Sequence, residues 1–204
     1  MGDPIYIEAA GEPSRMTSVA ADPEQMLDLV LVAARHGDDE LQAVLAALPA
    51  PIYTTDADGV VTFFNSACIG FAGRTPTVGK DRWCVTWKLY TTDGAPLPHD
   101  ECPMAVAVRE KRQVRDVVAL AERPDGTRVM FAPYPTPLHD ADGGFAGAVN
   151  ILIDVTDARQ AGELRAQAMR CRRLAHSVTD RRAVDTLLLM ASEYDDKARG
   201  LRPS

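Results

Sequence analysis

The chain has 204 residues and a formal net charge of −7; 46% of its residues are apolar and 25% are charged. This mixture is typical of a globular domain of ordinary size, and the acidic balance argues against general binding to nucleic acid or to anionic membranes. The N-terminus lacks the basic-then-apolar order of a signal peptide, and no apolar run has membrane-spanning length. We therefore expect a cytoplasmic protein without membrane contact.

The first predicted element is an amphipathic helix that follows a stretch rich in small and polar residues. Asp22-Pro23 is typical of a helix start, because Asp caps the first N–H groups and Pro is tolerated in the first turn. Apolar residues then recur at helical spacing until His36-Gly37, where the helix is predicted to end. Residues 1–37 are therefore expected to be a flexible start with one amphipathic helix.

A second helix, predicted to begin at Asp38 or Asp39, should stop at Pro49, after which the period of apolar residues changes. In the stretch PIYTTDADGVVTFFN, two β-type runs flank Asp56-Ala-Asp-Gly59. Asp-Gly between such runs is a strong hairpin signal, because Gly adopts positive φ at little steric cost. After this hairpin, residues 65–110 are expected to be irregular with helical pieces.

Three longer β-type runs follow, with Gly-bearing turns between them. They span Val114–Glu122, Thr127–Leu138 and Phe145–Val155. The middle run carries Pro at positions 133, 135 and 137, whose missing N–H groups all face one side of the strand, so we predict a frayed or edge-like end there. Five strands with helices grouped between the second and the third indicate an α+β fold.

Beyond Thr156 the apolar residues return to helical spacing. A seam with the three-and-four spacing of a coiled coil comprises Ala161, Leu164, Ala168, Cys171, Ala175 and Val178. After the interruption HSVTD, a last helix is expected to place Val184, Leu187, Leu188, Ala191 and Tyr194 on one face. Residues 157–204 are therefore predicted to form a C-terminal helical segment that resembles a short coiled coil.

The region from about Leu41 to Asp157 resembles a PAS domain, the small sensory module of bacterial signalling proteins. LPAPIYTTDADGVVTFFNSA resembles the opening hairpin of that family, and ERPDGTRVMFAPYPTPLHDADGGFAGAVNILIDVTDARQ resembles its closing strands. The resemblance places the domain at residues 38–156 and implies a five-stranded antiparallel sheet with helices on one face. It also implies that any ligand lies between sheet and helices, and that signals leave through flanking N- and C-terminal helices.

The same resemblance assigns a signal relay to the end of the last strand. In the Asp-x-Thr motif of the family, the Asp couples this strand to the exit helix, and the two positions correspond here to Asp154 and Thr156. Independently of the family, Thr156 is a residue type that caps helices, and Asp157 would be favourable near the positive end of the helix.

Four residues are candidates for lining a pocket. Trp83 and Trp87 belong to an aromatic-rich stretch that could contact an apolar ligand, although such residues more often cover a small core. In the family, the face of the last strand that carries Asn150 and Leu152 turns toward the cavity. A structural hydrogen bond is an equally good interpretation of Asn150.

The stretch PLPHDECPMAVAV has two interpretations. In the first, Pro103 occupies the first helical position, Cys102 is the cap, and the acidic pair lies where the helix dipole favours anions. In the second, His99 ligates haem, as in oxygen-sensing PAS domains. Pro103 places His99 before the helix and not within it, which favours the first interpretation. The spacing does not fit a zinc site, so we expect no metal.

The cysteines lie at positions 68, 84, 102 and 171, too far apart in sequence for a Cys-x-x-Cys pair, and free thiols are expected. The light-sensing branch of the family carries its reactive Cys in an Asn-Cys-Arg motif. Neither Cys68, which follows NSA, nor Cys84, which follows RW, matches this motif. We therefore expect no flavin and, overall, no cofactor, with haem as the alternative.

The C-terminal segment contains a basic cluster of Arg170, Arg172, Arg173, Arg181 and Arg182, and one histidine, His176. A solvated helix face explains the arginines better than DNA binding does, because the chain is acidic and shows no reading helix. The environment of His176 lacks the acidic neighbour usual for a phospho-accepting histidine, and only 28 residues follow it.

These observations favour a stand-alone PAS protein of bacterial signal transduction that acts through interactions and not as an enzyme. No Ser-His-Asp, paired-carboxylate or phosphate-loop pattern is recognisable more clearly than chance would produce. We expect a homodimer held mainly by the N-terminal helices and an unknown signalling partner, and the fold has room for a small-molecule ligand. The alternatives are a haem- or redox-sensing regulator of the same fold, and a phosphotransfer or DNA-binding regulator.

Overall fold

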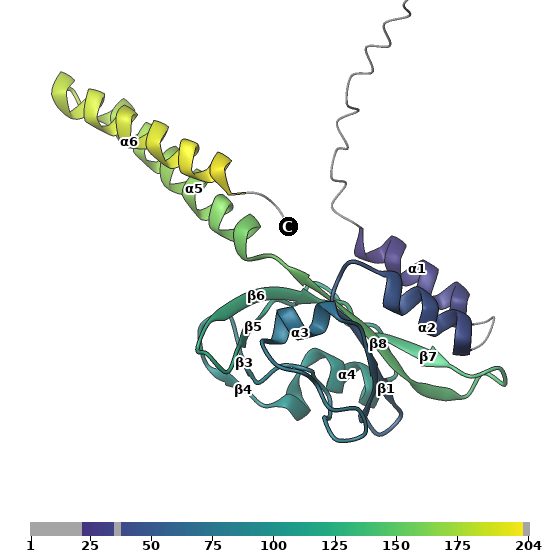
Figure 1. Ribbon diagram of the computed structural model, residues 1–204. Coiled ribbons are helices and arrows are strands. Elements are labelled where there is room, and N and C mark those ends of the chain that lie inside the picture. The colour runs from purple at the N-terminus through teal and green to yellow at the C-terminus, as the bar shows by residue number, and fades with distance from the viewer. Residues whose placement is uncertain (1–21, 35–37, 202–204) are drawn as a thin grey trace, which may run out of the picture.

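The computed structural model describes residues 22–34 and 38–201, which form a sheet-based body and a projecting pair of helices (Figure 1). The predicted end of the first helix at His36-Gly37 lies outside the described residues. The helical elements are α1 (Pro23–Ala34), α2 (Asp38–Ala47), α3 (Ala67–Ala72), the short 3-10 helix η1 (His99–Glu101), α4 (Pro103–Glu110), α5 (Thr156–Ser177) and α6 (Arg181–Gly200).

The body is built on one antiparallel sheet, whose strand order is β2-β1-β8-β6-β5-β3-β4, with β7 paired to β8. The strands are β1 (Ile52–Asp56), β2 (Val61–Phe64), β3 (Lys88–Tyr90), β4 (Pro96–Leu97), β5 (Ala119–Glu122), β6 (Arg128–Pro133), β7 (Thr136–His139) and β8 (Phe145–Asp154). The expected five strands are present, since β6 and β7 together form the fourth. The short pair β3 and β4 was not predicted, and it extends the sheet beyond β5.

The predicted hairpin between β1 and β2 is confirmed. The carboxylate of Asp56 accepts hydrogen bonds from the backbone N–H groups of Asp58 and Val60, both at 2.9 Å, and Gly59 has a φ of 79°. A side chain at Gly59 would collide with the indole ring of Trp83. Gly is therefore required both by the turn and by the ring that packs on it.

The proline-rich run is interrupted at Tyr134-Pro135, where β6 ends and β7 begins on the same side of β8. The N–H of Tyr134 donates to the carbonyl oxygen of Ile151 on β8 at 2.9 Å. The backbone nitrogens of the three prolines therefore face away from β8. Because no strand of the described chain pairs with β7 on that side, the missing N–H groups cost no hydrogen bond of the sheet there. This side is an open edge along β7, as the alternate prolines predicted.

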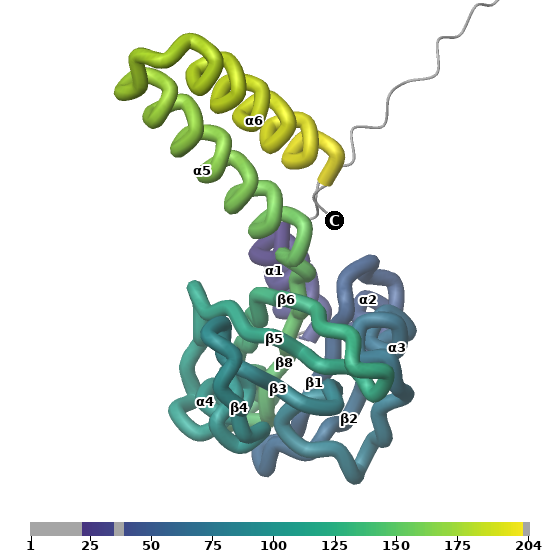
Figure 2. The backbone as a smooth tube through the Cα atoms, turned by 90° about the vertical axis from the view of Figure 1, so that its left-hand side faces the viewer, coloured from purple at the N-terminus to yellow at the C-terminus, as the bar shows by residue number. Residues whose placement is uncertain are grey.

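The inner face of the sheet carries the larger core, over which α3 and α4 pack (Figure 2). Its fully buried side chains are large and come from strands and helices alike, for example Tyr53, Met104, Phe131 and Leu152. They fill the space between sheet and helices in which PAS domains were expected to hold a ligand.

The outer face of the sheet is covered by the N-terminal helices α1 and α2, a position that the sequence did not predict. Leu27 and Val30 of α1 pack with Leu45 of α2 against Ile52 and Ile151 of the sheet. Because residues on a strand alternate between faces, β1 and β8 serve both cores. The apolar face of α1 is thus buried against its own sheet, so it cannot supply the dimer contact expected from the sequence.

The helices α5 and α6 form an antiparallel hairpin that projects from the body (Figures 1 and 2). The predicted seam is buried, but against α6 of the same chain. Ala168 and Cys171 pack there with Ala191 and the partly buried Tyr194. The carboxylate of Asp180 caps α6 by accepting from the N–H of Arg182 at 2.8 Å.

Candidate functional site

A network of polar groups crosses the inner core and links three segments of the body. The hydroxyl of Tyr53 donates to the backbone carbonyl of Trp83 at 2.9 Å, and it accepts from the amide of Asn150 at 3.1 Å. The amide oxygen of Asn150 accepts from the N–H of Tyr134 at 2.9 Å. Tyr53 and Asn150 are both buried, so satisfying these groups avoids a desolvation penalty.

Burial governs the chemistry of this network. Removal from water raises the pKa of Tyr53 well above its usual value, and the neighbouring thiols of Cys84 and Cys102 raise it further. Tyr53 is therefore a neutral hydrogen-bond donor and acceptor at every physiological pH. These hydrogen bonds can pass a displacement of one strand on to another. The network contains no group that readily gives up a proton or acts as a nucleophile.

Trp83 connects this network to the surface. Its backbone is left-handed, with a φ of 66°, a conformation that costs energy for a residue with a side chain. This geometry lets the indole lie against Gly59 while the carbonyl turns inward to Tyr53. Trp83 is partly buried and packs on the inner core, as a pocket-lining residue would.

The other predicted lining residues have different positions. Trp87 is 52% exposed and lines neither of the two hollows described below, so its role in lining a pocket stays a prediction. Leu152 is fully buried in the inner core, where it packs among apolar side chains. Asn150 faces the same core, and both of its described polar contacts are the structural hydrogen bonds given above.

Three free thiols, those of Cys68, Cys84 and Cys102, lie in the inner core. Burial raises the pKa of Cys68 to about 12, and it also raises the pKa of Cys102. The thiolate is the reactive form of cysteine, so burial suppresses reactivity at these two positions. The redox-sensor alternative therefore gains no support from the thiols.

His99 lies in η1, directly before α4, as expected from Pro103. Its Nε2 atom is buried and has no hydrogen-bond partner among the described residues. Burial lowers the pKa of His99, and the positive charge of Arg74 adds to this effect against the smaller influences of Asp81 and Asp100. His99 thus lies before α4 and not within it, and the charges of Arg74, Asp81 and Asp100 act on its ring. This environment does not fit a haem ligand.

The exit from β8 into α5 is held by one residue of β6. The backbone N–H of Met130 donates to the hydroxyl of Thr156 at 2.9 Å, and this hydroxyl donates back to the Met130 carbonyl at 3.3 Å. The N–H of Val155 also donates to this carbonyl, at 2.9 Å. The carboxylate of Asp154 accepts from the N–H of Thr156 at 2.9 Å. We call these four residues the exit junction.

The exit junction corrects one detail of the sequence interpretation. Thr156 is the first residue of α5 and not its cap, because Val155 occupies the cap position without a side-chain hydrogen bond. Asp154 instead satisfies the first free N–H of the helix, while Thr156 binds the neighbouring strand. Asp154 and Thr156 therefore hold the two positions expected of a relay.

Two further contacts that place the helices were not predicted from the sequence. The amide of Asn65 donates to the carbonyls of Ala50 and Leu48, at 2.8 and 3.1 Å, and accepts from the N–H of Ile52 at 3.2 Å. Asn65 thereby fastens the end of α2 to β1. Arg115 forms an ion pair with Glu24 at 2.7 Å, which fastens α1 to the body.

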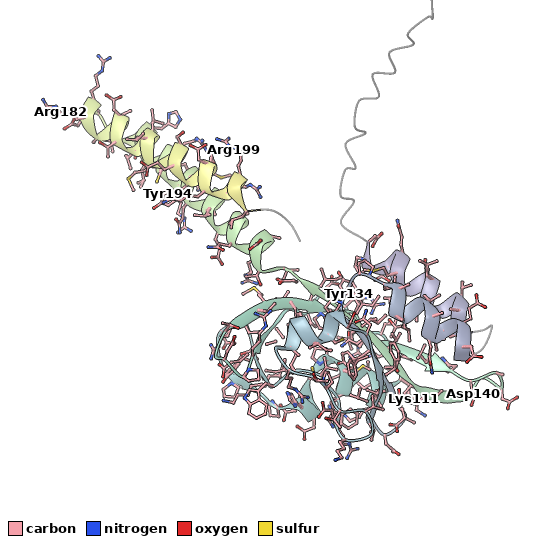
Figure 3. All side chains as sticks on the ribbon, in the orientation of Figure 1. Lys111, Tyr134, Asp140, Arg182, Tyr194 and Arg199 are labelled. Atoms are coloured by element: carbon pink, nitrogen blue, oxygen red, sulfur yellow. The ribbon has the colours of Figure 1, made fainter. Side chains whose placement is uncertain are left out.

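Two open hollows lie on the surface of the body. The larger, of about 1140 Å³, is bordered by α1, α2 and the β7–β8 end of the sheet. Thr55 lines it, and its hydroxyl is buried without a hydrogen-bond partner among the described residues. The smaller, of about 530 Å³, lies between the β1–β2 turn, Trp83 and the end of α4. Figure 3 shows Lys111, which borders both, at the edge of the body.

The C-terminal candidates lie on the projecting hairpin. His176 is exposed in the last turn of α5, and Arg172 is paired with Asp195 of α6. Arg182 lies at the far end of the hairpin (Figure 3). Within residues 22–34 and 38–201, no group of three His, Cys, Asp or Glu side chains could hold a metal ion. No helix in these ranges is long and apolar enough to cross a membrane.

Comparison with known proteins gives a family match and weaker similarities to solved structures. The family described as the PAS fold matches residues 45–160. No curated protein matches the sequence significantly. The LOV protein of Rhodobacter sphaeroides is similar in structure, with 12% identity, a TM-score of 0.40, and coverage of 87% of this chain and 96% of that chain.

Two further solved structures show the same level of similarity. The LOV domain of a blue-light activated histidine kinase from Erythrobacter litoralis has 23% identity and a TM-score of 0.41, over 52% of this chain and 96% of that chain. The PAS domain of Bordetella pertussis BvgS has 15% identity and a TM-score of 0.38, over 58% of this chain and 84% of that chain.

Proposed function

Because the chain belongs to the PAS fold family, we propose that it is a stand-alone sensory protein of bacterial signal transduction, which relays a ligand or partner signal through its flanking helices. The observation that carries this proposal is the exit junction. The hydrogen bonds of the exit junction, which join the start of α5 to the sheet, all involve Asp154 of β8 or Met130 of β6. A small shift between these two strands would therefore reorient α5 directly.

The hydrogen bonds among Tyr53, Trp83, Asn150 and Tyr134, which we call the inner network, link the core to the exit junction. Asn150 lies on β8 four residues before Asp154, and it binds Tyr134 next to the end of β6. A change at Tyr53 or Trp83 would thus alter the contact between the same two strands that hold α5. A path of this kind requires direct tests of coupling, because spatial connection alone does not establish it.

A double-mutant cycle tests the relay. Asn150→Ala should increase hydrogen exchange at residues 156–163 in the wild-type background. In a Thr156→Val background, where the exit junction is already broken, the same change should have a much smaller effect. Thr91→Val, in the exposed turn between β3 and β4, serves as the matched control and should leave exchange in α5 unchanged. Additive effects of Asn150→Ala and Thr156→Val would contradict the relay.

We also propose action by interaction and not catalysis, a cytoplasmic location and a homodimer. The buried face of α1 is not available for a dimer contact. The outward face of α1, on which Leu29 is 58% exposed, is therefore the better candidate. Light scattering should show a dimer that Leu29→Asp weakens while the fold is retained. A monomeric wild-type chain at micromolar concentration would exclude the dimer.

Haem sensing is not the function that the site supports. The orphaned Nε2 of His99 is the one feature in its favour, and Arg74 and Asp81 beside it are the wrong environment for an iron ligand. The purified protein should show no Soret band after haemin is added. A stoichiometric band that His99→Ala abolishes would overturn this conclusion.

A further inference from the structure

The smaller hollow, of about 530 Å³, combines positive charge with aromatic walls. We call it the rim pocket. The lining residues that matter here are Asp58, Arg82, Trp83, Arg109, Lys111 and Phe145. It is an open hollow at the edge of the inner core, because Val108 belongs to that core and Trp83 and Phe145 pack against it.

The cations of the rim pocket lack ion-pair partners. Within the described ranges, no carboxylate lies within ion-pair distance of Arg82, Arg109 or Lys111, whereas Arg74, Arg115 and Arg128 do pair. Asp58 supplies one carboxylate to the lining, which leaves an excess of two positive charges in a chain of net charge −7. Like charges gathered in one hollow repel one another, and an anion bound between them would relieve this repulsion.

The guanidinium groups of the rim pocket are also held in place. Nη2 of Arg82 donates to the backbone carbonyl of Asp58 at 2.7 Å, and Nη1 of Arg109 donates to the carbonyl of Asp100 at 2.5 Å. Arg82 stacks 5.3 Å from the Trp83 ring centroid, and Nζ of Lys111 lies 5.4 Å from that of Phe145. Fixed side chains lose less conformational entropy when they bind a ligand.

We propose that the rim pocket binds a small molecule with two or more negative charges, carried by phosphate or carboxylate groups. An excess of two positive charges matches a dianion. Each arginine has N–H donors beyond the one used by its backbone contact, and guanidinium forks bind phosphate and carboxylate oxygens in pairs. The rim pocket thereby supplies the ligand class that the proposed sensory function leaves open.

The rim pocket is connected to the relay, and this step rests on the proposed function. Trp83 forms one wall of the pocket and also accepts the hydrogen bond from Tyr53 in the inner network. Its strained left-handed backbone gives it an alternative conformation of lower local energy. An anion that shifts Arg82 and Trp83 would therefore change the bond to Tyr53, which is linked to β8 through Asn150.

Calorimetric titration with pyrophosphate and with citrate, at constant ionic strength, tests the site. Both anions should be compared on the full chain, and at least one should bind saturably with one site per chain. Arg82→Gln combined with Arg109→Gln should raise the dissociation constant at least tenfold. Lys80→Gln combined with Arg159→Gln removes the same charge outside the pocket and should change it less than twofold. Tighter pyrophosphate binding would identify a phosphate ligand, and tighter citrate binding a carboxylate.

Two outcomes would overturn the site: no saturable binding of either anion, or equal weakening in both double variants, which indicates non-specific attraction. The substituted side chains are exposed, so the variants should keep the wild-type thermal transition. If the Arg82/Arg109 double variant does not, Lys111→Gln replaces it and should also raise the dissociation constant. Hydrogen exchange in α5 separates the two proposals. Specific binding without a change in α5 supports the site and rejects the relay, whereas a relay without anion binding rejects the site alone.

Discussion

The body and the α5–α6 hairpin differ in what holds them together. The body buries large side chains on both faces of its sheet, including Tyr53 and Phe131 inside and Leu27 outside. The hairpin buries mainly alanines, with Cys171 and part of Tyr194 as its larger groups. A buried leucine contributes roughly 1.5–3 kcal/mol and a methyl group about 0.8 kcal/mol, so the hairpin is much the weaker unit.

This difference suits a sensor. A rigid body keeps the polar network and the rim pocket in register, while a weakly packed hairpin can open or change its angle at low cost. The ion pair between Arg172 of α5 and Asp195 of α6 is partly exposed and adds little to the stability of the hairpin. The exit junction connects the two units, so it sets the orientation of the hairpin relative to the body. The following experiments test this contrast.

The largest effect is expected from Leu27→Asp. Leu27 is 2% exposed and belongs to the outer core, so the substitution leaves a cavity and buries a carboxylate. The free energy of unfolding of the body should fall by at least about 3 kcal/mol in urea titrations followed by circular dichroism. Gln25→Asp, at an exposed position of the same helix, should cost no more than about 0.5 kcal/mol. Equal effects of the two changes would mean that α1 does not cover the sheet.

Overpacking of the hairpin seam should separate the two units. Ala191 is fully buried between α5 and α6, so Ala191→Leu should destabilise the hairpin by about 1–3 kcal/mol. Hydrogen exchange should accelerate throughout residues 157–200 while exchange in the sheet stays as in the wild type. Ser192→Leu, at an adjacent exposed position, is the matched control. Faster exchange in the sheet as well would show that the hairpin and body unfold as one unit.

Loss of the Thr156 hydroxyl should have a smaller, local effect. Thr156→Val removes both hydrogen bonds to Met130 and should cost about 1 kcal/mol, with faster exchange in the first turn of α5. Thr156→Ser keeps the hydroxyl and should behave almost like the wild type. If Ser and Val variants exchange alike, the methyl group and not the hydroxyl anchors the helix.

The smallest effect concerns pH. Burial lowers the pKa of His99 in the folded state, so the unfolded chain takes up the proton first as pH falls below about 6.5. The contribution of His99 to stability is complete above that pH and decreases as pH falls toward the lower folded-state pKa. His99→Gln should therefore flatten the decline in stability between pH 7 and 5. An unchanged decline would place the titrating group elsewhere.

The sequence by itself determined the local features whose causes are local. The turn at Asp56 to Gly59, the start of α4 at Pro103 and the open edge beside the alternate prolines depend on neighbouring residues alone. The PAS resemblance indicated Asp154 and Thr156 as the link between the last strand and the next helix, and they lie at the end of β8 and the start of α5. Even there the partner of Thr156 could not be predicted, because Met130 lies 26 residues away in sequence and meets it only through strand pairing.

The tertiary structure decided which apolar faces meet and which charges remain unpaired. The faces of α1 and α5 were recognisable as apolar, but periodicity does not say whether a face packs on its own sheet, on a neighbouring helix or on another chain. The structure places α1 on the outer sheet face and α5 on α6. The rim pocket likewise joins side chains from the β1–β2 turn, the segment at Trp83, the end of α4 and the start of β8, which are separated by up to 88 residues. Burial and ion pairing depend on such distant neighbours, so they are properties of the folded chain and not of its local sequence.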